Sequence, residues 1–487
     1  MHVDFPQTFC LGAAARRDIT PPVGIYHRMW GAATHDRSTG VHRPLTATAL
    51  ALAPETEHNT PGGDVAQRAQ VVVAVDHCLL WSDEMDALRA AVCRKSGLEL
   101  DQLHVALSHT HAAGLMDPGR ASLPGGELIA PYLDLLAERI GEAASEALGL
   151  LRPVRIVYGA GRCALAAHRD FWDAENGWFV CGYNPGGPAD DTVLVARIAD
   201  EQSRMVATVV NYACHATTLA WDNTLLSPDY VGAMRELVEN ATGAPCVFLQ
   251  GASGDLGPRR GYVGDVAVAD RNGRELGYAA LAALESLGPP GTRFEYTGPV
   301  VSGATLGTWD YRPLEPDKLC EKYRWHSAQW KVELPYRADL PNREETESQL
   351  IHWQQEEQAA IARGEVAQAR DCRAGAERMM RQLSRLRSLP AGDSLGVPVS
   401  VWRVGDAFWV LIAGEYYNLL QRSLRKRFPE HPIVIATVTD GWRPGYVPTA
   451  DTYGKGIYQE SIAIVSPGSL EKLIEVVGDQ LAALRSR

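Results

Sequence analysis

Residues that can bind a metal follow four apolar segments that we expect to be β-strands. His109 and His111 come directly after 103–107, His215 follows 205–211, Glu415 follows 407–412, and Tyr446 comes further past 432–438. In an open α/β sheet, ligands bind in the crevice beyond the carboxyl ends of the strands. Two or three imidazoles and a carboxylate that meet there would form a catalytic zinc site, with three protein ligands and one position left for water.

His109 and His111 are two residues apart, so both side chains can face the same side of an extended chain. Either histidine alone could be a loop residue satisfied by backbone groups. The small residues 112–114 that follow leave open space around the backbone and favour a functional site.

His215 and Glu415 each have a structural alternative. His215 could be an ordinary residue after a strand, but the nearby sequence Ser227-Pro228-Asp229 predicts a helix start, with serine as the N-cap. That helix end would lie near the same crevice and favour a substrate carboxylate or an oxyanion. Glu415 could be a helix N-terminal carboxylate, yet it follows a very apolar strand, and a buried carboxylate needs a partner such as a metal.

Two serines could be mistaken for nucleophiles. Ser253 lies in the small-residue loop 250–258, which lacks the G-x-S-x-G motif. That motif occurs around Ser394, but there it follows a helix and precedes a strand, the reverse of the context that the motif requires. The chain contains no P-loop and no dinucleotide-binding fingerprint.

Predicted strands and helices alternate along most of the chain, which indicates an α/β fold with a mixed, largely parallel sheet. The region from about Glu315 to Leu389 is rich in Glu, Gln, Arg and Ala and predicts helices. We therefore divide the chain into a catalytic domain, residues 1–310 and 396–487, and a helical insertion, residues 311–395. A solvated helical cap is the favoured interpretation of the insertion, and a lid over the site is the alternative.

The composition indicates a globular protein of 487 residues with a formal net charge of −12. No Lys/Arg-rich stripe is present, so we expect no nucleic-acid partner. No apolar run approaches ~20 residues, so we expect no transmembrane helix. The nine cysteines are scattered without a Cys-x-x-Cys pair, and the N-terminus has no signal-peptide pattern, which favours a cytoplasmic protein. Nothing in the sequence indicates the oligomeric state.

In the number and order of its motifs, the chain resembles the catalytic domain of the neutral (non-lysosomal, alkaline) ceramidases, and in particular their shorter bacterial relatives. The matching segments are 12–21, 40–45, 71–76, Ser108-His109-Thr110-His111, Asn211 to His215, Ser227-Pro228-Asp229, Phe248 to Asp255, Gly414-Glu415 and Gly445-Tyr446-Val447-Pro448. Members of this family are zinc-dependent amidases that cut the N-acyl bond of a sphingoid base.

The resemblance implies a set of site residues. His109, His215, Glu415 and the phenol of Tyr446 would hold one zinc ion per chain, and His111 would lie beside it. Arg169 falls where the family has a substrate-binding arginine, and Asp255 matches the aspartate of the family's Gly-Asp-Val-Ser-Pro loop. Where that loop has a serine important for activity, this chain has Gly257. We also expect no C-terminal β-sandwich of the kind that full-length ceramidases carry.

These observations lead to the hypothesis of a zinc-dependent hydrolase that cleaves the amide bond of a small or medium, soluble N-acyl substrate. Zinc-activated water would attack directly, because no serine stands at position 257, and His111, Tyr446, Arg169 and Asp255 would assist. The alternatives are ceramidase activity proper, ester or lactone hydrolysis at the same site, and a non-catalytic ligand-binding relative. Five tryptophans near the proposed site, a few of which could line a pocket, are Trp30, Trp172, Trp178, Trp221 and Trp442.

Overall fold

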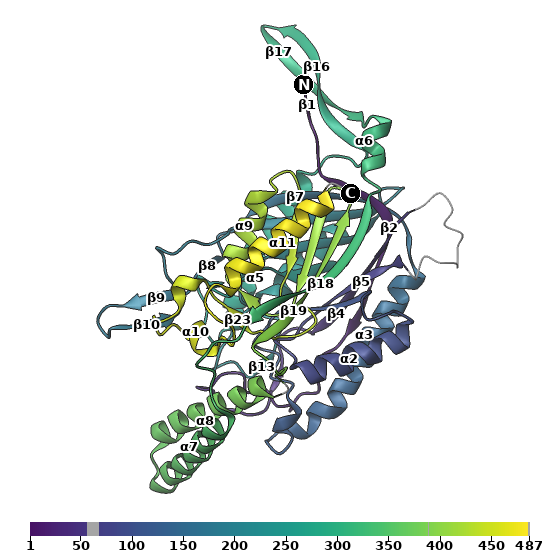
Figure 1. Ribbon diagram of the computed structural model, residues 1–487. Coiled ribbons are helices and arrows are strands. Elements are labelled where there is room, and N and C mark those ends of the chain that lie inside the picture. The colour runs from purple at the N-terminus through teal and green to yellow at the C-terminus, as the bar shows by residue number, and fades with distance from the viewer. Residues whose placement is uncertain (56–67, 388, 486–487) are drawn as a thin grey trace.

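The computed structural model describes residues 1–55, 68–387 and 389–485, and it has a four-layer arrangement of helices, sheet, sheet and helices (Figure 1). The α/β class predicted from the sequence is confirmed. Two sheets face each other across an apolar core, and helices cover the outer face of each sheet.

The larger sheet has eight strands in the order β14-β12-β11-β7-β2-β4-β5-β6. Their bounds are β2 Gln7–Asp18, β4 Thr46–Ala53, β5 Gln70–Val75, β6 Leu103–Leu107, β7 Arg152–Arg162, β11 Thr192–Asp200, β12 Met205–Tyr212 and β14 Cys246–Gln250. Only the β5–β6 and β12–β14 pairs are parallel, and the other five pairs are antiparallel. The prediction of a largely parallel sheet is therefore wrong, because alternating apolar segments do not reveal which strands become neighbours.

The second sheet has four strands in the order β18-β19-β20-β22. Their bounds are β18 Trp325–Pro335, β19 Ser394–Val404, β20 Ala407–Ile412 and β22 Ile433–Ala436. Successive side chains of a strand point to opposite faces, so this sheet contributes to two cores. Trp402, Trp409 and Leu411 point toward the larger sheet, whereas Val401 and Val410 pack beneath the outer helices.

Six helices form the outer layers. α2 (Ser82–Ser96) and α3 (Ile129–Gly149) cover one half of the larger sheet, and α4 (Tyr230–Thr242) and α5 (Val266–Glu285) cover the other half. α9 (Leu419–Arg427) and α11 (Ser469–Arg485) cover the smaller sheet. The remaining short elements are β1 His2–Val3, β3 Gly40–Val41, β8 Ala166–His168, β9 Asp170–Asp173, β10 Trp178–Cys181, β13 Leu225–Leu226, β15 Leu256–Pro258, β21 Glu415–Tyr416, β23 Tyr446–Val447, α6 Pro316–Glu321 and α10 Tyr458–Ile462.

Two hairpins project from the layers (Figure 1). One is the β-hairpin of β16 (Thr292–Ser302) and β17 (Ala304–Pro313), which the sequence analysis missed. The other is the helical hairpin of α7 (Arg343–Arg363) and α8 (Val366–Leu386), as predicted for this region. Residues 325–335 were expected to be helical too, but they form β18, whose alternating Trp330, Val332 and Leu334 face the core side. Within the described ranges, no helix is both long and apolar enough to cross a membrane.

The larger sheet curls, so that strands far apart in its order end near one another. β14, the first strand in the hydrogen-bonded order, contacts β4, β5 and β6, which are the last three. The chain that follows β22 fills the remaining gap: Thr437 N donates to Gln250 O at the end of β14, and Leu107 N of β6 donates to Val438 O. This arrangement brings the loop after β6 to the loop after β12, where Thr110 pairs with Ala216.

Asn211 joins the two sheets by a buried amide. Its Nδ2 donates to Leu249 O of β14 at 2.9 Å and to Ile435 O of β22 at 2.7 Å, and its Oδ1 accepts from Ile435 N at 3.1 Å. An Arg425 guanidinium also donates to Oδ1 at 3.0 Å. The amide thus satisfies backbone groups that neither sheet pairs by itself.

We predict that Asn211→Ala lowers the free energy of unfolding by about 2–4 kcal/mol, because buried backbone groups lose their partners. Urea unfolding followed by circular dichroism measures this loss. Asn240→Ala, at an exposed position on α4, is the matched control and should change stability by less than about 0.5 kcal/mol. Equal stabilities of the two variants would contradict the role of Asn211 as a link between the sheets.

Candidate metal centre and adjoining cavity

His109 is held at the end of β6 in a backbone conformation that few residues adopt. Its φ is +62°, in the left-handed region, which non-glycine residues enter at a cost of about 1 kcal/mol or more. Its Nδ1 donates to the carbonyl of Cys78 at 2.7 Å, which fixes the ring and directs Nε2 toward the centre of the site. Strain at this position is consistent with a constrained functional geometry.

His215 is oriented in the same way from the loop after β12. Its Nδ1 donates to the carbonyl of Ser253 at 2.7 Å. Its Nε2 points toward Nε2 of His109. The Ser253 hydroxyl lies 3.3 Å from the same Nδ1 and accepts a hydrogen bond from Gln250. Ser253 is therefore behind the imidazole, on the edge opposite Nε2, and it does not face the reactive side.

Glu415 and Tyr446 reach the site on a pair of short parallel strands, β21 and β23, in which they are direct partners. Gly414 makes this approach possible, because its φ is +98° and a Cβ atom there would lie 2.7 Å from Pro444 Cδ. The indole Nε1 of Trp442 donates to Glu415 Oε1, which leaves Oε2 free to face the histidines.

Four side-chain atoms meet at this point. The Nε2 atoms of His109 and His215 are 3.2 Å apart, and Glu415 Oε2 lies 3.1 Å from the first and 2.9 Å from the second. The hydroxyl of Tyr446 lies 3.1 Å from His215 Nε2. Since both Nδ1 atoms give their protons to backbone carbonyls, two neutral imidazoles here would direct lone pairs at each other and at a carboxylate, a repulsion that a proton on His109 or a bound cation removes. This arrangement requires a positive charge at its centre, and its nitrogen and oxygen donors suit Zn²⁺.

The pKa values of the buried groups also indicate that a positive charge is favoured at this point. Burial opposes charge on His109, but Glu415 and Cys78 together outweigh burial, so the pKa of His109 lies well above its usual value. Burial and the Arg169 guanidinium lower the pKa of His215 to about 3, so this imidazole is neutral, the form that binds metals. Burial would raise the pKa of Glu415, yet His109 and His215 together hold it well below its usual value.

His111 lies beside the cluster and is not part of it. Its ring centroid is 5.0 Å from that of His109 and 5.2 Å from that of Trp30. Its Nε2 is buried and makes no hydrogen bond within the described structure. Burial, followed by the two neighbouring imidazoles, holds the pKa of His111 well below its usual value. A neutral imidazole whose nitrogen has no hydrogen-bond partner can form a hydrogen bond with a ligand or accept a proton from it.

Arg169 and Asp255 have different surroundings. Arg169 is buried, its guanidinium carbon lies 5.3 Å from the centroid of the Tyr446 ring, and its Nε has no partner among the described residues. Asp255 Oδ1 instead accepts from Asn418 N at 2.6 Å, so the carboxylate holds the turn between β21 and α9. Burial raises the pKa of Asp255 to about 6. Arg169 therefore faces the site, and Asp255 supports the chain behind it.

A cavity of about 590 Å³ adjoins the cluster, and its size is typical of a small-molecule site. One side consists of His111, Tyr446 and Arg169. A second side is aromatic and contains Trp30, Trp221 and Tyr262, whose rings contact one another. The third side is one face of α8, with Ala374, Glu377, Arg378, Arg381 and Arg385. The interpretation of the helical hairpin as a solvated cap is wrong for this face.

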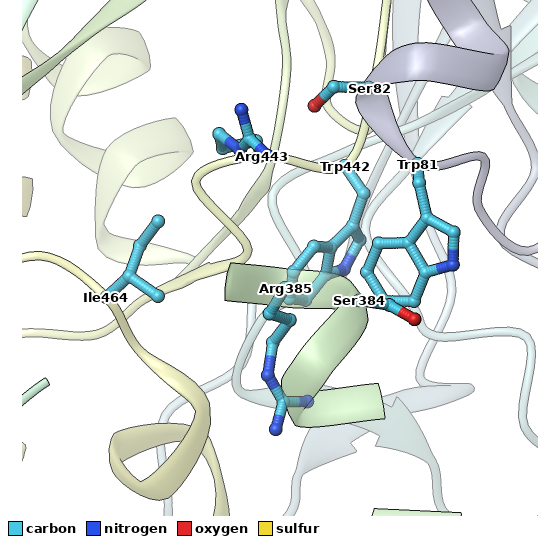
Figure 2. Close-up of a pocket in the computed structure, with 7 residues that line it drawn as sticks. All are labelled: Trp81, Ser82, Ser384, Arg385, Trp442, Arg443 and Ile464. Atoms are coloured by element: carbon cyan, nitrogen blue, oxygen red, sulfur yellow. The ribbon is translucent and has the colours of Figure 1, made fainter. Parts of the chain in front are cut away.

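The C-terminal end of α8 also lies beside Trp442, the residue that holds Glu415 of the candidate metal cluster. Figure 2 shows Ser384 and Arg385 of α8 beside the indoles of Trp81 and Trp442, with which they line a small hollow. The two indoles meet edge to face with centroids 5.4 Å apart. Since Trp442 also bonds Glu415, α8 packs against the residue that orients a proposed metal ligand.

The structure brings some of the predicted site features together and separates others. The proposed ligands His109, His215, Glu415 and Tyr446 do meet, and the segment 227–229 lies against the loop of His111, where Ser227 N donates to Ala112 O. The predicted helix cap is wrong, because α4 begins at Tyr230 and its N-cap is Asp229. The hydrogen bond from Trp442 and the arginines of α8 were missed, although Trp442 was noted as close to the site. Trp172 and Trp178 are exposed on β9 and β10, away from the cavity.

Comparison with solved structures identifies the fold. A crystal structure of neutral ceramidase from Pseudomonas aeruginosa superimposes with a TM-score of 0.62 and 16% sequence identity, over 99% of this chain and 75% of that one. A structure described as ceramidase complexed with C2 gives a TM-score of 0.62 and 15% identity, over 99% of this chain and 76% of that one. The chain therefore has the neutral ceramidase fold. No family model and no curated protein matches the sequence.

We predict that His215→Ala removes bound zinc, because it deletes one of the donors that surround the centre of the cluster. His111→Ala should keep at least about half of the zinc, since its Nε2 lies outside the cluster. Elemental analysis of the purified variants measures the metal content per chain. His352→Ala, on the exposed surface of α7, is the control and should bind zinc as the unchanged protein does. Loss of zinc in His111→Ala with retention in His215→Ala would reverse the two assignments.

Proposed function

We propose that this protein is a zinc-dependent hydrolase of the neutral ceramidase family that cleaves the amide bond of an N-acyl compound. The observation that carries the proposal is the cluster of His109, His215, Glu415 and Tyr446, which opens toward a cavity large enough for a substrate. The shared fold supports the family assignment, while the activity rests on the site, because one fold can host many chemistries.

His109, His215 and Glu415 would hold the ion, and the phenol oxygen of Tyr446 would provide a fourth donor. When bound, zinc lowers the pKa of water toward ~7 and polarises a carbonyl group. Three protein donors with an additional weak one leave room for the substrate, as in other catalytic zinc sites. The two backbone carbonyls, of Cys78 and Ser253, keep both imidazoles in the tautomer that the metal needs.

The side chains around the cluster would each carry out a different step of amide hydrolysis. His111 Nε2, which is buried and without a partner in the described structure, would take a proton from the attacking water and give one to the leaving amine. The free Nε of Arg169 and the phenol of Tyr446 would donate hydrogen bonds to the oxyanion that forms at the scissile carbonyl. Asp255 would act only by positioning, because its carboxylate is bound to Asn418 N.

Direct attack by water fits the surroundings better than a serine nucleophile. Ser253 lies behind His215, on the Nδ1 side, and Ser394 is far along the chain at the start of β19, where it bonds Glu333. At Gly257 the nearest atoms to an added Cβ would be Thr217 Oγ1 at 3.8 Å and Arg169 Cδ at 3.9 Å. A serine would fit there, so packing does not force the glycine, and its presence leaves the space beside Thr217 and Arg169 without a hydroxyl.

The test of this function is hydrolysis of N-acyl amines, N-acyl amino acids, lactones and a short-chain ceramide by zinc-loaded protein, with release of the amine or acid measured by chromatography. We expect turnover of at least one amide, loss of more than about 90% of it on chelation, and recovery with added Zn²⁺. Hydrolysis of lactones alone would redirect the proposal to esters. Ligand binding without turnover of any compound, or turnover that survives removal of the metal, would contradict it.

We predict that Tyr446→Phe lowers kcat by about 100-fold, because one donor to the oxyanion is lost, which typically costs about 10²–10³ in rate. Steady-state kinetics on the best amide substrate measures the effect, and metal content measured in parallel separates it from loss of zinc. Tyr416→Phe is a matched control: Tyr416 is buried nearby, and its hydroxyl has no hydrogen-bond partner in the described structure. An equal loss in both variants would mean that the phenol of Tyr446 has no specific role.

A further inference from the structure

The cavity wall formed by α8 carries positive charge that the protein itself does not neutralise. Arg378, Arg381 and Arg385 lie on one face of α8, at the three- and four-residue spacing that aligns side chains along a helix, and all three line the cavity. Among the described residues, none of the three forms an ion pair with a carboxylate.

The one carboxylate on the same face is already occupied. Glu377 lies 2.7 Å from Arg120 and 3.5 Å from Arg373, and it accepts a hydrogen bond from Tyr26 at 3.0 Å. Arg381 lies close enough to help lower the pKa of Glu377 but forms no ion pair with it in the described structure, whereas Arg120 and Arg373 both lie within ion-pair distance of this one carboxylate. Glu415 is not among the residues that line this cavity, and its carboxylate oxygens contact His109, His215 and Trp442. The three arginines of α8 thus remain in excess.

Two of these arginines also have few hydrogen-bond acceptors around their guanidinium groups. Arg385 is 8% exposed, and its only hydrogen-bond acceptor in the described structure is the amide oxygen of Gln382. Burial lowers the pKa of Arg385 to about 10, so the group still carries its charge at neutral pH. Arg381 donates to the carbonyl of Met29, but its Nε is buried and has no partner among the described residues. Buried charges without partners are costly, so a ligand that supplies negative charge would be favoured.

We infer that the substrate is anionic: an N-acyl compound whose carboxylate, or another oxyanion, binds Arg381 and Arg385 on α8 while its apolar part lies against Trp30, Trp221 and Tyr262. This inference rests on the proposed amide hydrolysis and adds the substrate class. Guanidinium groups bind carboxylates through two parallel hydrogen bonds, which gives both affinity and orientation. Half-exposed aromatic rings suit an acyl chain or a ring, so the cavity combines one charged and one apolar wall.

The experiment uses two pairs of compounds that differ only in charge. The first pair is N-decanoylglycine and N-decanoylglycinamide, and the second is the succinic monoamide of decylamine and its uncharged diamide. The first pair places the anion on the amine side of the scissile bond, and the second places it on the acyl side. We expect kcat/KM to be at least tenfold higher for the anionic member of one pair. Equal or better hydrolysis of the neutral members in both pairs would overturn the inference.

Matched variants connect the preference to α8. Arg381→Gln and Arg385→Gln should each reduce the ratio of anionic to neutral kcat/KM at least fivefold, because each removes one of the two guanidinium groups proposed to bind the anion. The ratio is the readout, since a general effect of either substitution acts on both substrates and cancels. Arg370→Gln, on the same helix but outside the cavity, is the control and should leave the ratio unchanged. A ratio that stays the same in both cavity variants would contradict the assignment.

Binding measured by calorimetry separates this inference from the proposed function. If the anionic compounds bind at least tenfold more tightly than the neutral ones, and Arg381→Gln removes the difference, the charged wall is supported even when no compound is cleaved. In that case hydrolysis fails and the anion site stands. If compounds are cleaved without any preference for charge in rate or in binding, hydrolysis stands and the anion site fails. If none of the four compounds binds, the inference is overturned.

Discussion

The structure depends on one constraint: two imidazole lone pairs and a carboxylate oxygen must be held within about 3 Å of each other in a buried place. Such an arrangement repels itself unless positive charge lies between the donors. The surrounding protein keeps these side chains from rotating apart, because backbone carbonyls hold both imidazole rings and Trp442 holds the carboxylate. This arrangement is the physical basis of the metal site proposed above.

The fold meets this constraint by curling its larger sheet. β6 and β12 are separated by five strands in the hydrogen-bonded order, so a flat sheet would keep His109 and His215 far apart. The chain after β22 bonds to both β14 and β6, and it thereby closes the distance between their loops. Glu415 arrives from the second sheet, through β20. The metal cluster is thus the place where both sheets and the connection between them meet, and Asn211 stabilises the same junction from behind.

Much of the site could be predicted from the sequence because its residues follow strand ends directly. An apolar run of five to eight residues followed by His or Glu identifies the edge of a sheet, whichever way the neighbouring strands run. The order and direction of the strands could not be predicted, since a buried antiparallel strand between two apolar layers is as uniformly apolar as a parallel one. β18 was missed because its alternation of Trp330, Val332 and Leu334 lies in a region otherwise rich in helix-forming residues.

The arginines of α8 were overlooked for a different reason. On an isolated helix, arginines at three- and four-residue spacing describe a solvated face, and only the folded chain shows that this face lines a cavity next to His111. The same helix packs on Trp442, which holds Glu415 in place (Figure 2). One element therefore carries both the wall that would select an anionic substrate and the support of a metal ligand. Arg385 and Trp442 line the same small hollow, so an anion bound by Arg385, as proposed, would lie beside the indole that orients Glu415.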